Sequence, residues 1–284
     1  MLKYLTISLF LFGSLPAQPS LEDVKPDGSM ADRRLLSIVK RQQSLMERVA
    51  RTADENNTVS PDVERQITQL SNEWLSYVAD NPEDVDARIL YGKFLRSFGQ
   101  NESAVEQFLM ADRLDNSLPV VKQQIGNYMA ENGLYTESLT WFLQAVTLAP
   151  KEPRYHFQMG ELLYQYRWQF IEDGSFTRES LDRDMLTAFG QAAFLLPEDF
   201  PIQLRYAESY YDIEKPQWHV ALSAFEQALP LARNEVETQA VLLHLARVNM
   251  HLDNIEPAKE LLSRVNLPVY AATKAQIEAA LVEH

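Results

Sequence analysis

The sequence contains no cysteine, only nine glycines and few basic residues. Without cysteine, its 284 residues cannot form a disulfide, a thiolate metal site or a thiol nucleophile, so an apolar core must hold the fold together. Acidic residues number 40 and basic residues 26, giving a formal net charge of −14. This balance disfavours binding to nucleic acid or anionic lipid and favours basic partners.

The first seventeen residues have the composition of a secretory signal. Lys3 precedes an apolar run from Tyr4 to Leu15, and the small residue Ala17 ends the segment. The run is shorter than the roughly 20 residues of a membrane-spanning helix, which favours cleavage over permanent anchoring. We therefore expect an exported protein, periplasmic or extracellular, without an integral membrane span after cleavage, and a flexible tail over residues 18–31.

Catalytic motifs are missing from the sequence. It contains no HExxH, phosphate-binding glycine loop, calcium loop or GxSxG. His244 and His251 stand two helical turns apart with Asp253 nearby, but no third ligand at a known spacing supports a metal site. We predict no catalytic residue, no metal and no cofactor, and interpret the acidic cluster of Glu208, Asp212 and Glu214 as a solvated face.

The glycines recur with a period of 34 residues. The period relates Gly92 to Gly126 and Gly160, and Gly99 to Gly133. It extends to other residue types, in the pairs Ala104 and Ser138, Phe108 and Phe142, Ala111 and Ala145, and Leu114 and Leu148. So many positions in phase indicate an internal repeat of helix, turn and helix. The first glycine of each unit is interpreted as a helix contact and the second as a helix end.

The repeats cover most of the chain. Apolar spacing predicts a helix from Asp32 to about Thr52 and a second helix beginning at Ser60 and Pro61, together a leading pair over residues 32–84. Five units follow over residues 85–268, the third interrupted by an insert at about residues 167–184. Residues 269–284 form an amphipathic helix, with Ile277 and Leu281 on its apolar side, that we expect to cap the array.

The units resemble tetratricopeptide repeats (TPRs). In that family small residues occupy the eighth and twentieth places of the repeat and an aromatic residue occupies the twenty-fourth. Alanine occupies the twenty-seventh place and proline often occupies the thirty-second. The second unit matches all five places, with Gly126, Ser138, Phe142, Ala145 and Pro150. The first unit departs at the last place, where it has Asn116. The resemblance implies an all-α, right-handed solenoid, and it covers about two thirds of the chain without its first seventeen residues.

The resemblance also implies a concave binding face made by the first helices. Its positions would include Lys93, Arg96, Gln123, Asn127, Phe157, Glu161, Tyr164, Glu208, Tyr211 and Arg247. Their mixture of types suits an extended or helical peptide. The alternative is that apolar members such as Phe157 only pack against neighbouring helices. One family subgroup grips a terminal carboxylate with lysine, asparagine and arginine, but Gln123 replaces the lysine expected before Asn127, so that clamp is not supported.

Two further segments admit a binding role. Trp168, Phe170, Ile171 and Phe176 in the insert either anchor a partner or fold over the concave groove as a local cover. The leading helix carries six basic residues, Arg33, Arg34, Lys40, Arg41, Arg48 and Arg51, against Glu47 alone. These residues either face an acidic partner or membrane, or dock against the acidic repeats of the chain itself.

The sequence thus predicts an exported, non-catalytic interaction scaffold for an unknown protein or peptide, with a possible place in cell-envelope assembly. The competing hypothesis is an enzyme or small-ligand protein that uses a groove beneath the 167–184 insert. An enzyme would show a buried pocket with converging polar groups, whereas a scaffold would show an open surface.

Overall fold

The structure is a computed structural model that describes residues 28–52 and 60–283. The predicted signal (1–17) and most of the predicted tail (18–31) lie outside these residues. Throughout the described ranges the regular elements are helices, without a strand, as the sequence predicts. None of the described helices is both long and apolar enough to cross a membrane.

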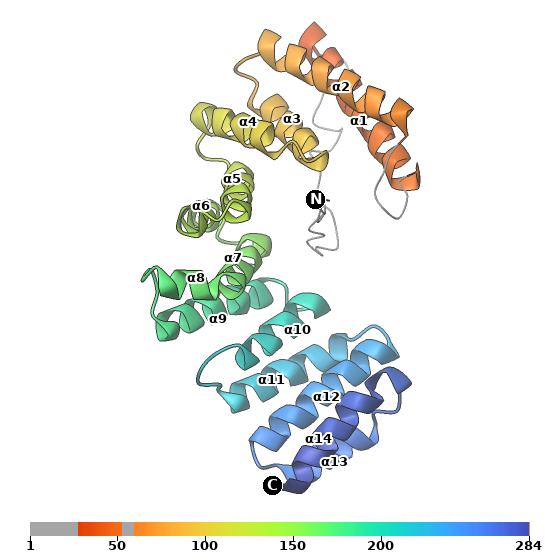
Figure 1. The fold of residues 1–284 in the computed structure, drawn as a ribbon, viewed down its shortest axis with the longest axis vertical. Coiled ribbons are helices and arrows are strands. Elements are labelled where there is room, and N and C mark those ends of the chain that lie inside the picture. The colour runs from red at the N-terminus through yellow and green to blue at the C-terminus, as the bar shows by residue number, and fades with distance from the viewer. Residues whose placement is uncertain (1–27, 53–59, 284) are drawn as a thin grey trace, which may run out of the picture. The chain divides into compact units, whose positions relative to one another are not determined.

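The chain divides into two compact units, Met1–Leu114 and Asp115–His284. The first unit contains α1 (Met30–Thr52), α2 (Pro61–Asp80), α3 (Val85–Ser97) and α4 (Asn101–Leu114). Within it α1 packs against α2, α2 against α3, and α3 against α4 (Figure 1).

The second unit contains the remaining helices (Figure 1). They are α5 (Pro119–Glu131), α6 (Tyr135–Leu148), α7 (Pro153–Gln165), α8 (Arg167–Glu172), α9 (Arg178–Leu195), α10 (Phe200–Glu208), α11 (Trp218–Ala228), α12 (Glu235–His251), α13 (Ile255–Ser263) and α14 (Ala271–Glu283), with short 3₁₀ turns η1 (Ser209–Tyr211), η2 (Leu229–Leu231) and η3 (Pro268–Tyr270). The hairpins are α5–α6, α7–α9, α10–α11 and α12–α13, and neighbouring hairpins stack through α6–α7, α9–α10 and α11–α12. This order is the helix-hairpin stacking of an α-solenoid.

The periodic glycines sit where two helices of a hairpin touch. A Cβ atom added to Gly92 would lie 2.7 Å from Cε1 of Phe108, and one added to Gly160 would lie 2.8 Å from Cδ1 of Phe189. Both phenylalanines are buried, and each such ring contributes about 1.5–3 kcal/mol to folding. Glycine is therefore needed at these positions, because a side chain there would occupy the space that the phenylalanine ring fills.

The second glycine of each unit ends its first helix. Gly99 and Gly133 adopt positive φ angles of 73° and 78°, and Asp253 takes the equivalent place with φ 57°. After each of them the next amide donates to a carbonyl five residues back, as Leu134 does to Met129 at 2.9 Å. This is the Schellman closure, which satisfies carbonyls at a helix end and requires a left-handed residue.

A polar side chain near the start of three first helices fixes the preceding turn. Arg88 donates to the carbonyl of Pro82 at 2.7 Å, and a ring nitrogen of His156 lies 2.9 Å from the carbonyl of Pro150. Gln203 donates to the carbonyl of Leu196 at 3.1 Å. These bonds satisfy carbonyls that follow a helix end, so each hairpin is tied to the one before it.

The last helix covers the final hairpin as predicted. Ile277 and Leu281 of α14 are buried in a cluster with Leu242 and Ala246 of α12 and Leu262 of α13. Without α14 these residues would form an exposed apolar face.

The insert differs from the expectation. Its residues are not one added segment between two regular helices, because α8 is a short helix and α9 already begins at Arg178, inside the predicted insert. Thr177 and Ser180 cap α9 reciprocally, which explains the early start. The leading helix likewise begins at Met30, two residues early, because Ser29 and Asp32 exchange capping hydrogen bonds.

Candidate functional site

Side chains from successive first helices meet on one surface of the second unit. We call this surface the first-helix face and define it by residues of α5, α7, α10 with η1, and α12. It contains eight of the predicted binding residues, namely Gln123, Asn127, Phe157, Glu161, Tyr164, Glu208, Tyr211 and Arg247. Lys93 and Arg96 lie on α3 in the first unit, and Trp168 and Phe176 lie in or beside α8.

Arg205 of α10 is the centre of the first-helix face. Its Nε donates to Glu161 of α7 at 2.7 Å, and its Nη1 donates to the carboxylate of Asp212 at 3.2 Å. The guanidinium also lies over the rings of Tyr164 and Phe189, at 4.5 and 4.3 Å from their centroids. Because charged hydrogen bonds and cation–π contacts are both strong at a partly desolvated site, Arg205 fixes the side chains around it.

The loop after α10 is held against the start of α9. Arg167 and Arg178 both donate to the backbone carbonyl of Asp212, at 2.8 and 2.6 Å. Asp182 pairs with Arg178 and accepts the amide of Glu214 at 2.8 Å. The two irregular parts of the repeat array, the insert and the lengthened turn after α10, therefore bind each other, and this contact positions η1.

Glu208, Tyr211 and His244 connect α10 and η1 to α12. Nε2 of His244 lies 3.6 Å from the Glu208 carboxylate, and the Tyr211 hydroxyl donates to the His244 carbonyl at 3.3 Å. Burial, with the nearby Arg247, lowers the pKa of His244 to about 4. Burial is also the main cause that raises the pKa of Glu208. Of the acidic cluster interpreted as a solvated face, Glu214 is exposed and Glu208 is half-buried. The interpretation is wrong for Asp212, which is partly buried and ion-paired with Arg205.

The remaining predicted residues of the face divide into packed and open ones. Phe157 contacts the ring of Phe189 with centroids 5.6 Å apart and belongs to the core edge. Gln123 is buried and donates to Gln158 of α7 at 2.7 Å, which links α5 to α7. Tyr164 is 38% exposed, whereas Asn127 is half-buried.

The aromatic residues of the insert differ in their burial. Phe170 is fully buried and meets Phe176 and Tyr135 edge to face, with centroids 5.5 and 6.5 Å apart. The helix α8, which carries Phe170, contacts α6 and α7. Trp168 remains 66% exposed, with the Arg178 guanidinium 5.7 Å from its ring centroid. Of the insert aromatics considered for partner binding, Trp168 is therefore the most accessible.

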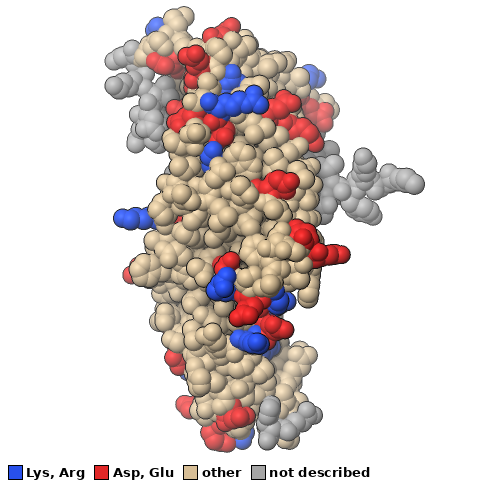
Figure 2. All heavy atoms as spheres, turned by 90° about the vertical axis from the view of Figure 1, so that its left-hand side faces the viewer, with Lys and Arg blue, Asp and Glu red and all other residues tan. Residues whose placement is uncertain are grey.

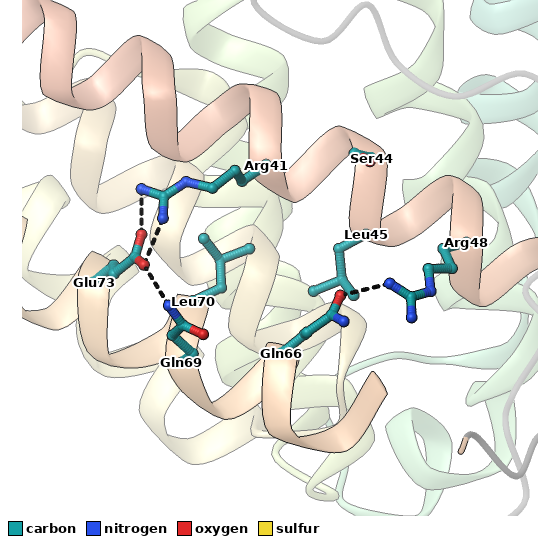
Figure 3. A pocket seen from close by; sticks show the side chains of 8 residues that line it. All are labelled: Arg41, Ser44, Leu45, Arg48, Gln66, Gln69, Leu70 and Glu73. Atoms are coloured by element: carbon teal, nitrogen blue, oxygen red, sulfur yellow. Dashed lines mark hydrogen bonds and ion pairs between the residues drawn. The ribbon is translucent and has the colours of Figure 1, made fainter. Parts of the chain in front are cut away.

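The leading helix uses three of its arginines within its own hairpin. Arg34 pairs with Asp80, Arg41 with Glu73 and Arg48 with Asp62, so that basic α1 docks on acidic α2. Figure 3 shows the hollow between these helices, with a volume of 260 Å³, lined by Arg41, Ser44, Leu45, Arg48, Gln66, Gln69, Leu70 and Glu73. Both guanidinium groups in it already bind chain atoms, which identifies them as hairpin contacts.

Charged side chains elsewhere are dispersed. On the side of the molecule that Figure 2 draws, acidic and basic groups are interspersed among neutral residues, so the net charge of −14 is not gathered there into one patch. In the described residues no three His, Asp or Glu side chains are grouped as metal ligands would be.

Arg205 was not among the predicted binding residues, nor were Arg167 and Arg178 assigned a role. Arg167 and Arg178 bind a backbone carbonyl distant in sequence, an interaction without a spacing signature. The signal that could have found Arg205 is its place on the first helix of a repeat, three positions before Glu208, which is among the predicted residues of the concave face.

Comparison with known proteins identifies the architecture. No protein-family model and no curated protein matches the chain. Among solved structures, the C-terminal part of a TPR repeat-containing protein from Cytophaga hutchinsonii superposes with a TM-score of 0.59 at 14% identity, covering 88% of this chain and 98% of that one. YrrB, a TPR protein, gives 0.58 at 16% identity with coverages of 74% and 99%.

PilW, a type IV pilus biogenesis factor, gives a TM-score of 0.53 at 13% identity and covers 86% of this chain and 98% of its own. These identities establish a shared fold and nothing finer. The predicted repeat architecture is thereby confirmed, and the chain has the fold of tetratricopeptide repeat proteins, an all-α solenoid of helix hairpins.

Proposed function

We propose that the chain is a protein–protein interaction scaffold that binds a peptide or protein segment on the first-helix face. One observation carries this proposal: α7, α10 and α12 hold charged and aromatic side chains in one contact network that stays partly open to solvent. Tyrosine and arginine are the residue types that dominate the energy of many protein interfaces.

The network lowers the entropy that binding would cost. Arg205 is only 16% exposed and is fixed by Glu161 and Asp212, so these side chains lose little freedom when a partner covers them. Ordering a flexible side chain at an interface costs about 0.5–1.5 kcal/mol, and prior ordering removes that cost. A fixed polar face therefore suits recognition of a specific segment.

Two structural neighbours are consistent with such a role. YrrB is described as a TPR protein with an unusual peptide-binding site, and PilW as a widely conserved type IV pilus biogenesis factor. Together with the signal-like residues 1–17, they support an exported, non-catalytic scaffold in cell-envelope assembly, periplasmic or extracellular.

Site-specific photo-crosslinking tests the binding face. A benzoylphenylalanine in place of Tyr164 would report partners on the first-helix face, and the same group in place of Leu143, 48% exposed on α6, is the control. We expect a crosslinked partner from the Tyr164 position and none from the Leu143 position. Equal crosslinking at both positions, or at Leu143 alone, would contradict the proposal.

Export is tested separately by sequencing the N-terminus of the protein purified from its cellular compartment. Cleavage after Ala17 predicts a first residue near Gln18. Full-length protein that sediments with membranes would overturn this part of the proposal without affecting the binding face.

A further inference from the structure

The carboxylates of the first-helix face differ in their contacts with arginine side chains. Arg205 binds both Glu161 and Asp212, at 2.7 and 3.2 Å. Glu208 lies beside them on α10, yet among the described residues the only basic side chain within 4.0 Å of its carboxylate is His244. Glu208 therefore lacks the arginine contact that its two neighbours have.

His244 does not neutralise Glu208 at neutral pH. Its imidazole stacks on Phe225 with centroids 4.9 Å apart and ring planes within 5° of parallel. This burial, with the nearby Arg247, lowers its pKa to about 4, so the ring is uncharged near pH 7. The 3.6 Å contact between His244 and Glu208 is then not an ion pair.

The charged side chains of this network also differ in their exposure to solvent. The side chain of Glu208 is 38% exposed and that of Glu161 27%, whereas the arginine between the carboxylates is 16% exposed. Of the charged side chains in this network, Glu208 is therefore the most exposed. The chain carries a net charge of −14, which favours the approach of a cation to this carboxylate.

Aromatic rings border this position. Tyr211 follows Glu208 by three residues and contacts Phe225, Trp218 and His244, each with ring centroids 5.7 Å away. Arg247 occupies one approach to the Tyr211 ring, with its Cζ atom 5.9 Å from the ring centroid. A cation beside Glu208 would lie next to apolar, partly desolvated walls, which strengthens its attraction to the carboxylate.

We propose that Glu208 binds a lysine or arginine side chain of the partner segment, so that the scaffold selects basic peptides. This inference rests on the proposed function and specifies its ligand. A hydrogen bond between charged groups contributes about 1.5–3 kcal/mol, which corresponds to a change in affinity of about 10-fold to 100-fold.

Fluorescence anisotropy with three labelled octapeptides tests the inference on the full chain. One peptide alternates lysine with alanine, and the other two carry glutamate or serine in place of lysine. We expect the lysine peptide to bind most tightly. Glu208→Gln should weaken its binding by about tenfold or more, while Glu226→Gln, an equal charge change at an exposed position of α11, should alter it less than twofold.

A charge swap completes the test. Glu208→Lys should bind the glutamate peptide more tightly than the lysine peptide, provided that its helical circular dichroism is that of the wild type. Equal affinities of Glu208→Gln and Glu226→Gln for the lysine peptide would overturn the inference. So would tighter binding of the serine or glutamate peptide to the wild type.

The two proposals fail in distinguishable ways. If the serine or glutamate peptide binds best and Tyr164→Ala weakens it, the first-helix face stands and the basic ligand is wrong. If no octapeptide binds and a group at Tyr164 crosslinks nothing, both the face and the ligand are wrong.

Discussion

Replacement of Gly160 by alanine tests the packing that supports the first-helix face. The new methyl group would lie 2.8 Å from Cδ1 and Cε1 of Phe189, whereas ordinary carbon contacts lie at about 3.5–4.0 Å. The Phe189 ring cannot move away freely, because the guanidinium of Arg205, a residue of α10, lies 4.3 Å from the ring centroid. Relief of the clash must therefore disturb either the helix pair or the Arg205 network.

The expected loss of stability is the difference between two effects. Overpacking a core costs about 1–3 kcal/mol, and alanine gains about 1 kcal/mol over glycine in a helix interior. We expect a net loss of about 1 kcal/mol, which lowers the melting temperature of a domain of this size by about 2–4 °C. Gly126→Ala is the matched control, because its methyl group would lie 3.1 Å from Phe142 and need less movement, so its two effects should nearly cancel.

Calorimetry of the full chain measures both variants. A melting temperature for Gly160→Ala above that of the wild type would refute the reasoning, because it would mean that helix propensity outweighs the contact. The double variant Gly160→Ala with Phe189→Leu should recover part of the loss, since the smaller side chain makes room. Strict additivity of the two substitutions would show that they do not interact.

Four other substitutions have defined outcomes. The folded-state pKa of His244, about 4, lies below the ordinary histidine value of 6.5, so its contribution to stability is full above pH 6.5 and falls as the pH drops toward 4. His244→Phe should flatten that pH dependence, by up to about 3 kcal/mol in urea denaturation, and an unchanged slope would assign it to other groups. Arg205→Met leaves Glu161 and Asp212 without their partner and should cost about 2–3 kcal/mol by the same assay, whereas a cost near zero would deny Arg205 its central place. Asp253→Gly removes the strain of a non-glycine residue with positive φ and should stabilise the fold by up to about 1 kcal/mol. Gly133→Ala introduces that strain and should destabilise the fold by a similar amount. Thermal melts that show the opposite sign for either substitution would contradict the shared helix ending.

The sequence predicted what depends on local pattern. The glycine and phenylalanine contacts follow from a fixed 34-residue spacing, and the helix ends at Gly99 and Gly133 follow from the one residue type that accepts positive φ without strain. The start of α2 at Ser60 and Pro61 follows from capping chemistry in the same way.

What the sequence did not predict depends on contacts between distant segments. Arg167 and Arg178 meet the carbonyl of Asp212, which lies 45 and 34 residues away in the chain. No composition or spacing marks such a bond, because every residue has a carbonyl. The partial burial of Glu208 was missed for a related reason, since it results from packing between two repeats.

The central claim is that the first-helix face binds the partner. Its most direct test is the affinity of the purified crosslinked partner for the full chain, measured by titration calorimetry. Tyr164→Ala on the face should weaken binding by about tenfold or more, and Leu143→Ala on α6 should leave it unchanged. Equal affinities of the two variants, with unchanged melting temperatures, would contradict the claim.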